Sequence, residues 1–167
     1  MTKREGCAIL EKKGVARMLT VKRFYELSQD ELFAIYKARC DIFVVEQNCP
    51  YPEVDEFDKV ASHITYSEGG ALLAYCRLLP ERSRFEAASV GRVLATVRRR
   101  GYASLVVAEA IRAARDILKV DTLVLDAQTY VIGFYEKLGF AVTSGEFLED
   151  GIPHVQMTWK RGDQYGK

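Results

Sequence analysis

The sequence predicts an α/β domain in which helices cover the faces of a mixed β-sheet. A strand, a tight basic turn and a long helix follow one another between Val90 and Leu118. Two hairpin signals, Gly69-Gly70 and Asp150-Gly151, each separate a pair of apolar segments. The expected order of elements is β-α-loop-β-β-β-α-β-α-β-β, which combines hairpins with crossovers. The 167 residues contain no repeat or linker, so one domain is expected.

The composition is that of an ordinary soluble globular protein, with 49% hydrophobic and 28% charged residues. The net charge of +1, from 24 basic and 23 acidic residues, argues against a general nucleic-acid binder. No apolar run approaches the length of a membrane span. The N-terminus lacks the apolar core of a secretory signal. A cytoplasmic protein without a membrane partner is therefore expected.

Four cysteines are spread along the chain without the close pairing that metal sites use: Cys7, Cys40, Cys49 and Cys76. We expect reduced thiols and no metal site. Cys49 lies in a predicted loop, where it is either a reactive thiol or a structural one.

The N-terminal part begins with an unpatterned segment. Residues 1–17 are expected to form a loose tail, residues 18–161 the domain and residues 162–167 a second tail. A strand is expected over Leu19–Tyr25. Ser28 and Glu31 form a capping box, which predicts a helix that continues to about Val44. Leu32, Ile35, Arg39 and Ile42 or Phe43 share one helix face, which places Arg39 near the inner surface.

The middle of the chain is a long loop followed by strands. Pro50 and Pro52 exclude a regular helix, and the acidic run Glu53–Asp58 suggests a solvated loop of a length that is often functional. Strands are predicted over 61–67, 71–79 and 90–97, with a polar loop over 80–87. Further along, strands are predicted over 122–127, 140–147 and 155–160, and a helix over 130–138 that Gly139 ends.

The turn between Val97 and Ser104 is the strongest candidate for a binding site. It reads Arg98-Arg99-Arg100-Gly101-Tyr102-Ala103. A helix that begins after such a turn presents unpaired amides and the positive end of its dipole. The turn either binds a phosphate or pyrophosphate, or it only caps the helix. It lacks the Gly-Lys-Ser/Thr of a P-loop and the second glycine of a dinucleotide-binding turn.

Several motifs together resemble one family. Arg98-x-x-Gly101-x-Ala103 is similar to the Gln/Arg-x-x-Gly-x-Gly/Ala signature of the GNAT (GCN5-related) N-acetyltransferases. FYEKLGF, from Phe134 to Phe140, resembles the last helix of that family. The phrases VVEQNCPY and EDGIPH resemble the ElaA-type subfamily, and the resemblance extends from about Leu19 to Trp159. It implies a GNAT (acyl-CoA N-acyltransferase) fold. It also implies an acetyl-CoA-dependent N-acetyltransferase whose amine acceptor, a small molecule or a protein amine, is undefined.

The resemblance also implies how acetyl-CoA is held. The amides of the basic turn would bind the pyrophosphate, and Val93, Leu94 and Ala95 on a splayed strand would pair with the pantetheine arm. The connection before Arg98 is about two residues shorter than usual in the subfamily, so the register of this strand stays open. Gln128 either hydrogen-bonds the pantetheine arm or is a plain polar residue at a strand end. The expected cofactor-binding residues are Val93, Leu94, Ala95, Arg98, Arg99, Arg100, Gly101, Tyr102, Ala103, Ser104, Gln128, Phe134 and Tyr135.

Direct transfer is the mechanism that the resemblance implies. The amine attacks the thioester, a backbone N–H near Leu94 or Ala95 stabilises the oxyanion, and Tyr135 protonates the leaving thiolate. Without the family, Tyr135 would be interpreted as a half-buried packing residue.

The base that accepts the proton of the amine is open. Glu46 and His154 are the candidates, beside a chain of water. Glu46 either has a raised pKa or pairs with Arg39 or Arg92. His154 is either the base or an ordinary polar residue. Arg77 and Arg92 either bind an acidic acceptor or satisfy buried carboxylates. The expected substrate-binding residues are Arg39, Glu46, Arg77, Arg92 and His154.

Three other functions compete with this prediction. The first is a CoA-binding sensor or interaction module without turnover. The second is an enzyme with another acyl donor. The third and weakest is a nucleic-acid binder, because the clustered arginines are confined to one turn. A two-fold homodimer is the default expectation for the assembly.

Overall fold

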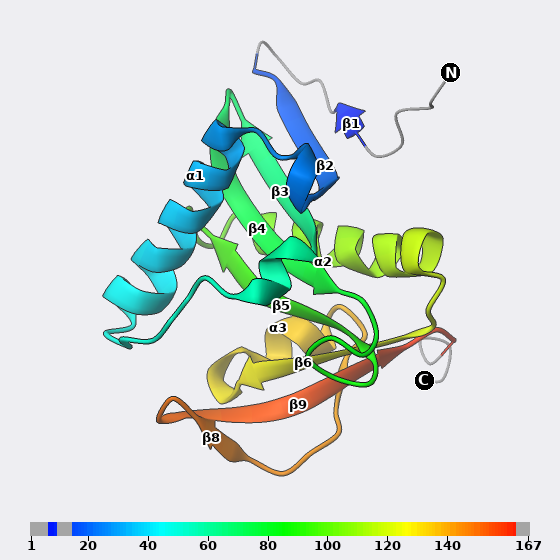
Figure 1. Cartoon of the computed structure of the whole chain (residues 1–167). Coiled ribbons are helices and arrows are strands. Elements are labelled where there is room, and N and C mark those ends of the chain that lie inside the picture. Colours follow the sequence, from blue (N-terminus) through cyan, green and yellow to red (C-terminus); the bar gives the residue numbers. More distant parts are fainter. Residues whose placement is uncertain (1–6, 10–14, 163–167) are drawn as a thin grey trace.

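The computed structural model describes the backbone of residues 7–9 and all atoms of residues 15–162. The loose tail expected over residues 1–17 is wrong where those residues are described, because Cys7–Ile9 form a strand that pairs with residues 18–20, and Arg17 begins the next strand. Residues 1–6, 10–14 and 163–167 of the expected tails lie outside the described residues. The described strands form one nine-stranded sheet in the order β1-β2-β3-β4-β5-β6-β9-β7, and β8 pairs with β9 (Figure 1). This is the mixed sheet that the element order predicts.

The first half of the sheet is an antiparallel meander. Its strands are β1 (Cys7–Ile9), β2 (Arg17–Arg23), β3 (Ser62–Glu68), β4 (Ala71–Leu79) and β5 (Ala88–Ala95). The β3–β4 connection is the predicted hairpin. Gly69 and Gly70 both have positive φ angles, 58° and 83°, which is the backbone geometry that a tight hairpin turn requires.

The second half begins with the one parallel pairing among the described strands. β6 (Thr122–Gln128) runs parallel to β5, and β9 (Ile152–Lys160) runs antiparallel to β6. The turn before β9 contains Asp150 and Gly151 with φ angles of 51° and 77°, as the hairpin signal predicts.

The single strand expected over 140–147 is wrong. The structure has two short strands there, β7 (Ala141–Val142) and β8 (Phe147–Glu149), and both pair with β9. Between them, the Ser144 hydroxyl accepts a hydrogen bond from the backbone N–H of Gln156 at 2.8 Å. A side chain therefore takes the place of a backbone ladder bond, and the strand is interrupted.

The helices begin and end close to where the sequence predicts. α1 (Gln29–Arg39) starts at the capping box, in which the Glu31 N–H donates to the Ser28 hydroxyl at 3.1 Å. It continues as the wider π-helical segment η2 (Cys40–Glu46). α2 (Tyr102–Ala113) is extended by the π-helical η4 (Ala114–Leu118), and α3 is Ile132–Glu136. The short 3-10 segments are η1 (Phe24–Glu26), η3 (Glu56–Lys59) and η5 (Thr129–Val131).

Helices cover both faces of the sheet (Figure 1). The central strands are therefore buried on both sides. On one face, Ile35 and Ala38 of α1 pack against Tyr75 and Leu94. On the other, α2 and α3 pack on a larger core that contains Cys76. Alternate residues of β4 therefore belong to different cores.

Two further observations concern the described part of the chain. Cys40, Cys49 and Cys76 are free thiols, as expected. None of the helices described is both long and apolar enough to cross a membrane.

Candidate functional site

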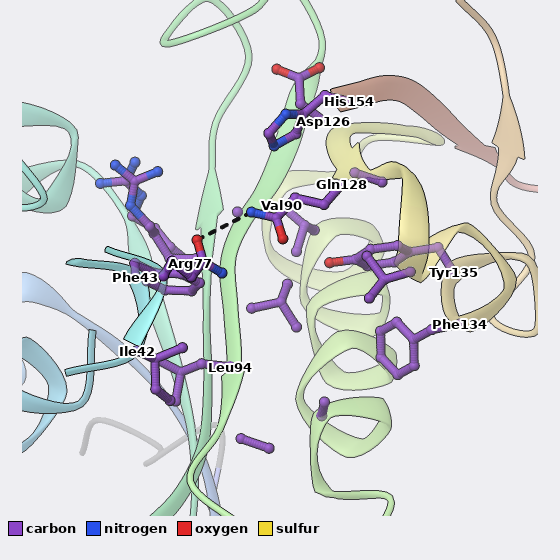
Figure 2. A pocket seen from close by; sticks show the side chains of 18 of the residues that line it. Ile42, Phe43, Arg77, Val90, Leu94, Asp126, Gln128, Phe134, Tyr135 and His154 are labelled. Carbon is purple, nitrogen blue, oxygen red and sulfur yellow. Dashed lines mark hydrogen bonds between the residues drawn. The ribbon is translucent and has the colours of Figure 1, made fainter. Parts of the chain in front are cut away.

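The two central parallel strands separate soon after they pair. β5 and β6 share only two register pairs, Ala88 with Leu123 and Ser89 with Val124. Beyond them lies a cavity of about 950 Å³ whose walls include the rest of β5, the end of β6 and α3. Figure 2 shows Leu94 and Tyr135 on opposite walls of this cavity. Because β6 has moved away, the backbone of β5 presents a strand edge to the cavity, and such an edge can pair with an extended ligand.

β5 contains a bulge in its pairing with β4. Tyr75 lies opposite Leu94 and Arg77 opposite Gly91, so two residues of β5, Arg92 and Val93, oppose one residue of β4. Arg92 has a φ of 55°, which is unusual for a residue with a side chain. Val93, the second residue of the bulge, and the following Leu94 and Ala95 all line the cavity.

The basic turn leads directly into α2. Gly101 has a φ of 75° and occupies the N-cap position without a side-chain cap. The first backbone bond of the helix runs from the Leu105 N–H to the Gly101 carbonyl at 3.3 Å. The amides of Tyr102, Ala103 and Ser104 therefore have no acceptor within the helix. These three residues and the exposed Arg98, Arg99 and Arg100 line one end of the cavity.

Tyr135 is a buried residue with its hydroxyl directed into the cavity (Figure 2). The residue is only 8% exposed, and the ring packs edge-on against Phe134 and Phe140, with centroids 4.9 and 5.9 Å away. Burial raises the pKa of Tyr135 above its ordinary value. The hydroxyl therefore stays protonated at neutral pH and can donate a proton.

Gln128 and His154 occupy neighbouring strands at the far end of the cavity. They are register partners on β6 and β9. The Gln128 amide donates to the Gln47 side-chain oxygen at 3.3 Å, from the β6 wall to the segment after η2. The Nδ1 of His154 lies 2.7 Å from the Ile152 carbonyl. A carbonyl only accepts, so Nδ1 carries the hydrogen and the lone pair of the neutral ring is on Nε2.

A buried ion network lies beneath the cavity. Arg39 is fully buried, and its Nε and Nη1 donate to Glu53 and Asp58, each at 2.7 Å. Arg77 contacts Asp58 at 2.9 Å and Asp55 at 2.5 Å. Burial alone would raise the pKa of Asp58, but the arginines outweigh it and lower that pKa.

Arg92 joins the same network from the bulge. Its Nε lies 2.8 Å from Glu53 and its Nη2 3.6 Å from Asp55. Of the two alternatives for Arg77 and Arg92, the structure shows the second, because both satisfy buried carboxylates. The expectation that Arg39 contacts a substrate is not met. Arg39 has no exposed surface and lies outside the cavity lining.

Glu46 makes a contact that differs from the expected one. Its carboxylate pairs with Arg98 of the basic turn, and both side chains are exposed. Arg39 and Arg92, the partners expected for Glu46, are instead held by Glu53. Glu46 thus lies at the end of the cavity that carries the arginines.

Three cavity residues escaped the sequence analysis. Arg84, Asp126 and Glu149 come from separate segments and meet at the end of the cavity near His154. The one signal in the sequence was Asp126, a carboxylate within the apolar strand TLVLDA. Its partners could not be inferred, because they depend on how the 80–87 loop and the β8–β9 hairpin fold over the strand ends.

The comparisons with known proteins agree with this geometry. A family model described as an acetyltransferase (GNAT) domain matches residues 43–161. The chain is 39% identical over 140 residues to a UPF0039 protein of Schizosaccharomyces pombe, covering 81% of this chain and 92% of that protein. It is 33% identical over 136 residues to protein ElaA of Escherichia coli, covering 79% and 89%.

Solved structures give the same picture. An acyl-CoA N-acyltransferase from Pseudomonas aeruginosa superposes with a TM-score of 0.78 at 35% identity, covering 84% of this chain and 98% of that one. Escherichia coli ElaA superposes with a TM-score of 0.79 at 29% identity, covering 85% and 98%.

The buried network predicts a large cost when Arg39 is replaced. Arg39→Met leaves Glu53 and Asp58 short of a buried partner, and the free energy of unfolding should fall by roughly 3–5 kcal/mol in urea titrations. Arg112→Met is the control, since Arg112 makes exposed ion pairs on α2 and should cost less than about 1 kcal/mol. Equal losses in the two variants would contradict the assignment.

His63 predicts how stability depends on pH. Its ring is fully buried, with Nδ1 2.8 Å from the Tyr75 hydroxyl and Nε2 2.9 Å from the Asp58 carbonyl. Burial lowers its pKa, so below about pH 6.5 the unfolded chain takes up a proton that the folded chain does not. Stability should therefore fall between about pH 6.5 and 5, by up to roughly 1.4 kcal/mol per pH unit.

The comparison for this pH effect is His63→Gln, measured by urea unfolding across the same pH range. The variant should show a shallower slope, because it lacks the buried imidazole whose pKa is lowered in the folded chain. The lowered pKa of Asp58 has no influence here, because a carboxylate of that kind titrates below about pH 4. Identical slopes would count against the role of His63.

Gly101→Asp should weaken acetyl-CoA binding at least about tenfold, which is roughly 1.4 kcal/mol. The added carboxylate would face the pyrophosphate at the positive end of α2. Gly70→Asp is a matched control, because Gly70 has a similar φ, 83°, and open space around it, but lies outside the cavity lining. Calorimetric titration checks both variants. If Gly101→Asp binds acetyl-CoA as tightly as the wild type, or if Gly70→Asp loses as much affinity, the pyrophosphate does not bind at the basic turn.

Proposed function

Because the chain belongs to the GNAT acetyltransferase family, and within it to the ElaA-type group, we propose that it transfers the acetyl group of acetyl-CoA to an amine. Family membership makes it an acyl-CoA-dependent acyltransferase. The acetyl donor and the amine acceptor are the proposed part. The observation that carries the proposal is the hydroxyl of Tyr135, directed into the cavity where β5 leaves β6.

Different parts of the cavity wall suit different parts of the acyl-CoA donor. The free amides of Tyr102, Ala103 and Ser104, with the three arginines beside them, suit the pyrophosphate. The free edge of β5 at Val93, Leu94 and Ala95 suits the amide groups of the pantetheine arm. The thioester would then lie between Leu94 and Tyr135, with Phe134 as an apolar neighbour.

The proposed reaction is a direct transfer. The amine nitrogen attacks the thioester carbonyl carbon, and a backbone N–H of β5 near Leu94 or Ala95 stabilises the oxyanion. The C–S bond breaks, and the CoA sulfur takes the proton of Tyr135. The nitrogen loses one proton to a base, which leaves an N-acetyl product and free CoA.

His154 and Glu46 remain the proposed bases, and their surroundings differ. The Nε2 of His154 carries the lone pair of the neutral ring and lies at the acceptor end of the cavity. Glu46 pairs with Arg98 at the cofactor end. The geometry supports His154 more strongly, since a base must reach the incoming amine.

Tyr135→Phe should lower kcat by roughly 10²-fold or more, because it removes the proton donor for the thiolate. The affinity for acetyl-CoA should change little, since the ring and its packing are kept. The measurement combines CoA release in the presence of amines with calorimetric titration of acetyl-CoA. An amine panel without turnover in the wild type would favour a CoA-binding sensor. Faster transfer from longer acyl-CoAs would favour another donor.

A further inference from the structure

Three charged side chains and His154, all from separate segments, form a cluster at the acceptor end of the cavity. Arg84 comes from the 80–87 loop, Asp126 from β6, Glu149 from β8 and His154 from β9. The Arg84 Nη2 lies 3.0 Å from the Asp126 Oδ2 and 2.5 Å from the Glu149 Oε1. The His154 Nε2 lies 3.8 Å from the Glu149 Oε2. We call these four residues the Arg84 cluster; Figure 2 shows Asp126 and His154 close together.

The other arginines at this end are already paired. Arg77 and Arg92 contact Glu53, Asp55 and Asp58 in the buried network. By contrast, the Arg84 cluster contains two carboxylates and one guanidinium. The acceptor end therefore carries an excess of negative charge in this cluster, whereas the cofactor end carries the basic turn.

Asp126 has unused hydrogen-bonding capacity. Its side chain is only 10% exposed, and its Oδ1 atom is buried without a hydrogen-bond partner among the described residues. Burial raises its pKa, Arg84 opposes that effect and Glu149 adds to it, while the nearby side-chain amide of Gln156, its partner across the β6–β9 pair, lowers it as a hydrogen-bond donor to the carboxylate. The Gln156 amide is a neutral donor, and Oδ1 itself has no donor in hydrogen-bonding geometry in the described part of the chain. A buried carboxylate oxygen without a donor is costly, and a positively charged donor would satisfy it best.

Resting on the proposed transfer to an amine, we propose that the Arg84 cluster is the acceptor site and that the acceptor is a positively charged alkylammonium compound. The ammonium group binds between Asp126 and Glu149, where the Arg84 guanidinium lies in this structure. Acidic acceptors are disfavoured because both carboxylates repel them. A small diamine has the required chemistry, because one amino group can bind there as the cation while the other attacks the thioester as a neutral amine.

The acceptor preference tests the charge of the site. Diaminobutane, aminobutanol and aminobutanoate share a four-carbon chain and end in a cation, a neutral hydroxyl and an anion. With acetyl-CoA as donor, kcat/KM should fall in that order, by about tenfold or more between the first and the last. A lysine-containing peptide with a blocked N-terminus is the control, since its single amine cannot both bind the cluster as a cation and attack the thioester. Faster transfer to this peptide than to diaminobutane would contradict the inference.

Substitutions in the Arg84 cluster should change the affinity for diaminobutane in opposite directions. Glu149→Gln and Asp126→Asn should each weaken diaminobutane binding by about tenfold, whereas Arg84→Gln should tighten it, because the cation that competes for the carboxylates is gone. Calorimetric titration of diaminobutane in the presence of CoA measures this without turnover. Glu146→Gln is the control, since Glu146 is exposed and lies outside the cavity lining.

Two results would overturn the inference while leaving the proposed function intact. One is a preference for aminobutanoate in a protein that does transfer acetyl groups. The other is unchanged diaminobutane affinity in Glu149→Gln and Arg84→Gln proteins that still bind acetyl-CoA normally. Failure of the wild type to bind acetyl-CoA would instead contradict the proposed function. Glu149 is partly exposed, so its variant still tests the site if Asp126→Asn does not fold.

Discussion

The separation of β5 from β6 is the constraint on which the site depends. Parallel strands in a sheet normally continue their ladder, but here the ladder stops after two register pairs. The bulge at Arg92 and Val93 accompanies this separation, since it bends β5 and changes the direction of its backbone groups. The same separation leaves room for Tyr135 to reach the cavity from α3. A regular ladder would fill this space with backbone and leave no room for a ligand.

The buried ion network holds the other side of the cavity in place. Arg92 connects the bulge to Glu53, and Arg39 connects Glu53 to α1. A loop with two prolines and an acidic run is thereby fixed against both a strand and a helix. Replacing a whole buried ion network with apolar residues can leave the free energy of unfolding unchanged, whereas removing one partner is costly. What this network contributes to the site is the fixed position of its residues. It fixes the loop, the end of α1 and the bulge relative to one another.

Opposite charges mark the two ends of the cavity. Arg98, Arg99 and Arg100 surround the positive end of α2, where an anion is favoured. Asp126 and Glu149 lie at the other end, beyond Tyr135. Under the proposed function, an anionic donor and a cationic amine would enter from different sides and meet at the buried hydroxyl, where the low dielectric environment strengthens each electrostatic contact.

Local patterns in the sequence determined most of the elements. The capping box at Ser28, the glycine turns, the strand–turn–helix around Gly101 and the family motifs gave the fold, the basic turn and Tyr135, because each depends on residues close together along the chain. The interrupted strand over 140–147 was not foreseen, since a side chain of Ser144 replaces a ladder bond to β9. Only the tertiary structure decided the partners of Arg77, Arg92 and Glu46, and the meeting of Arg84, Asp126 and Glu149. Ion pairs between distant segments depend on the exact course of loops, which local periodicity does not encode.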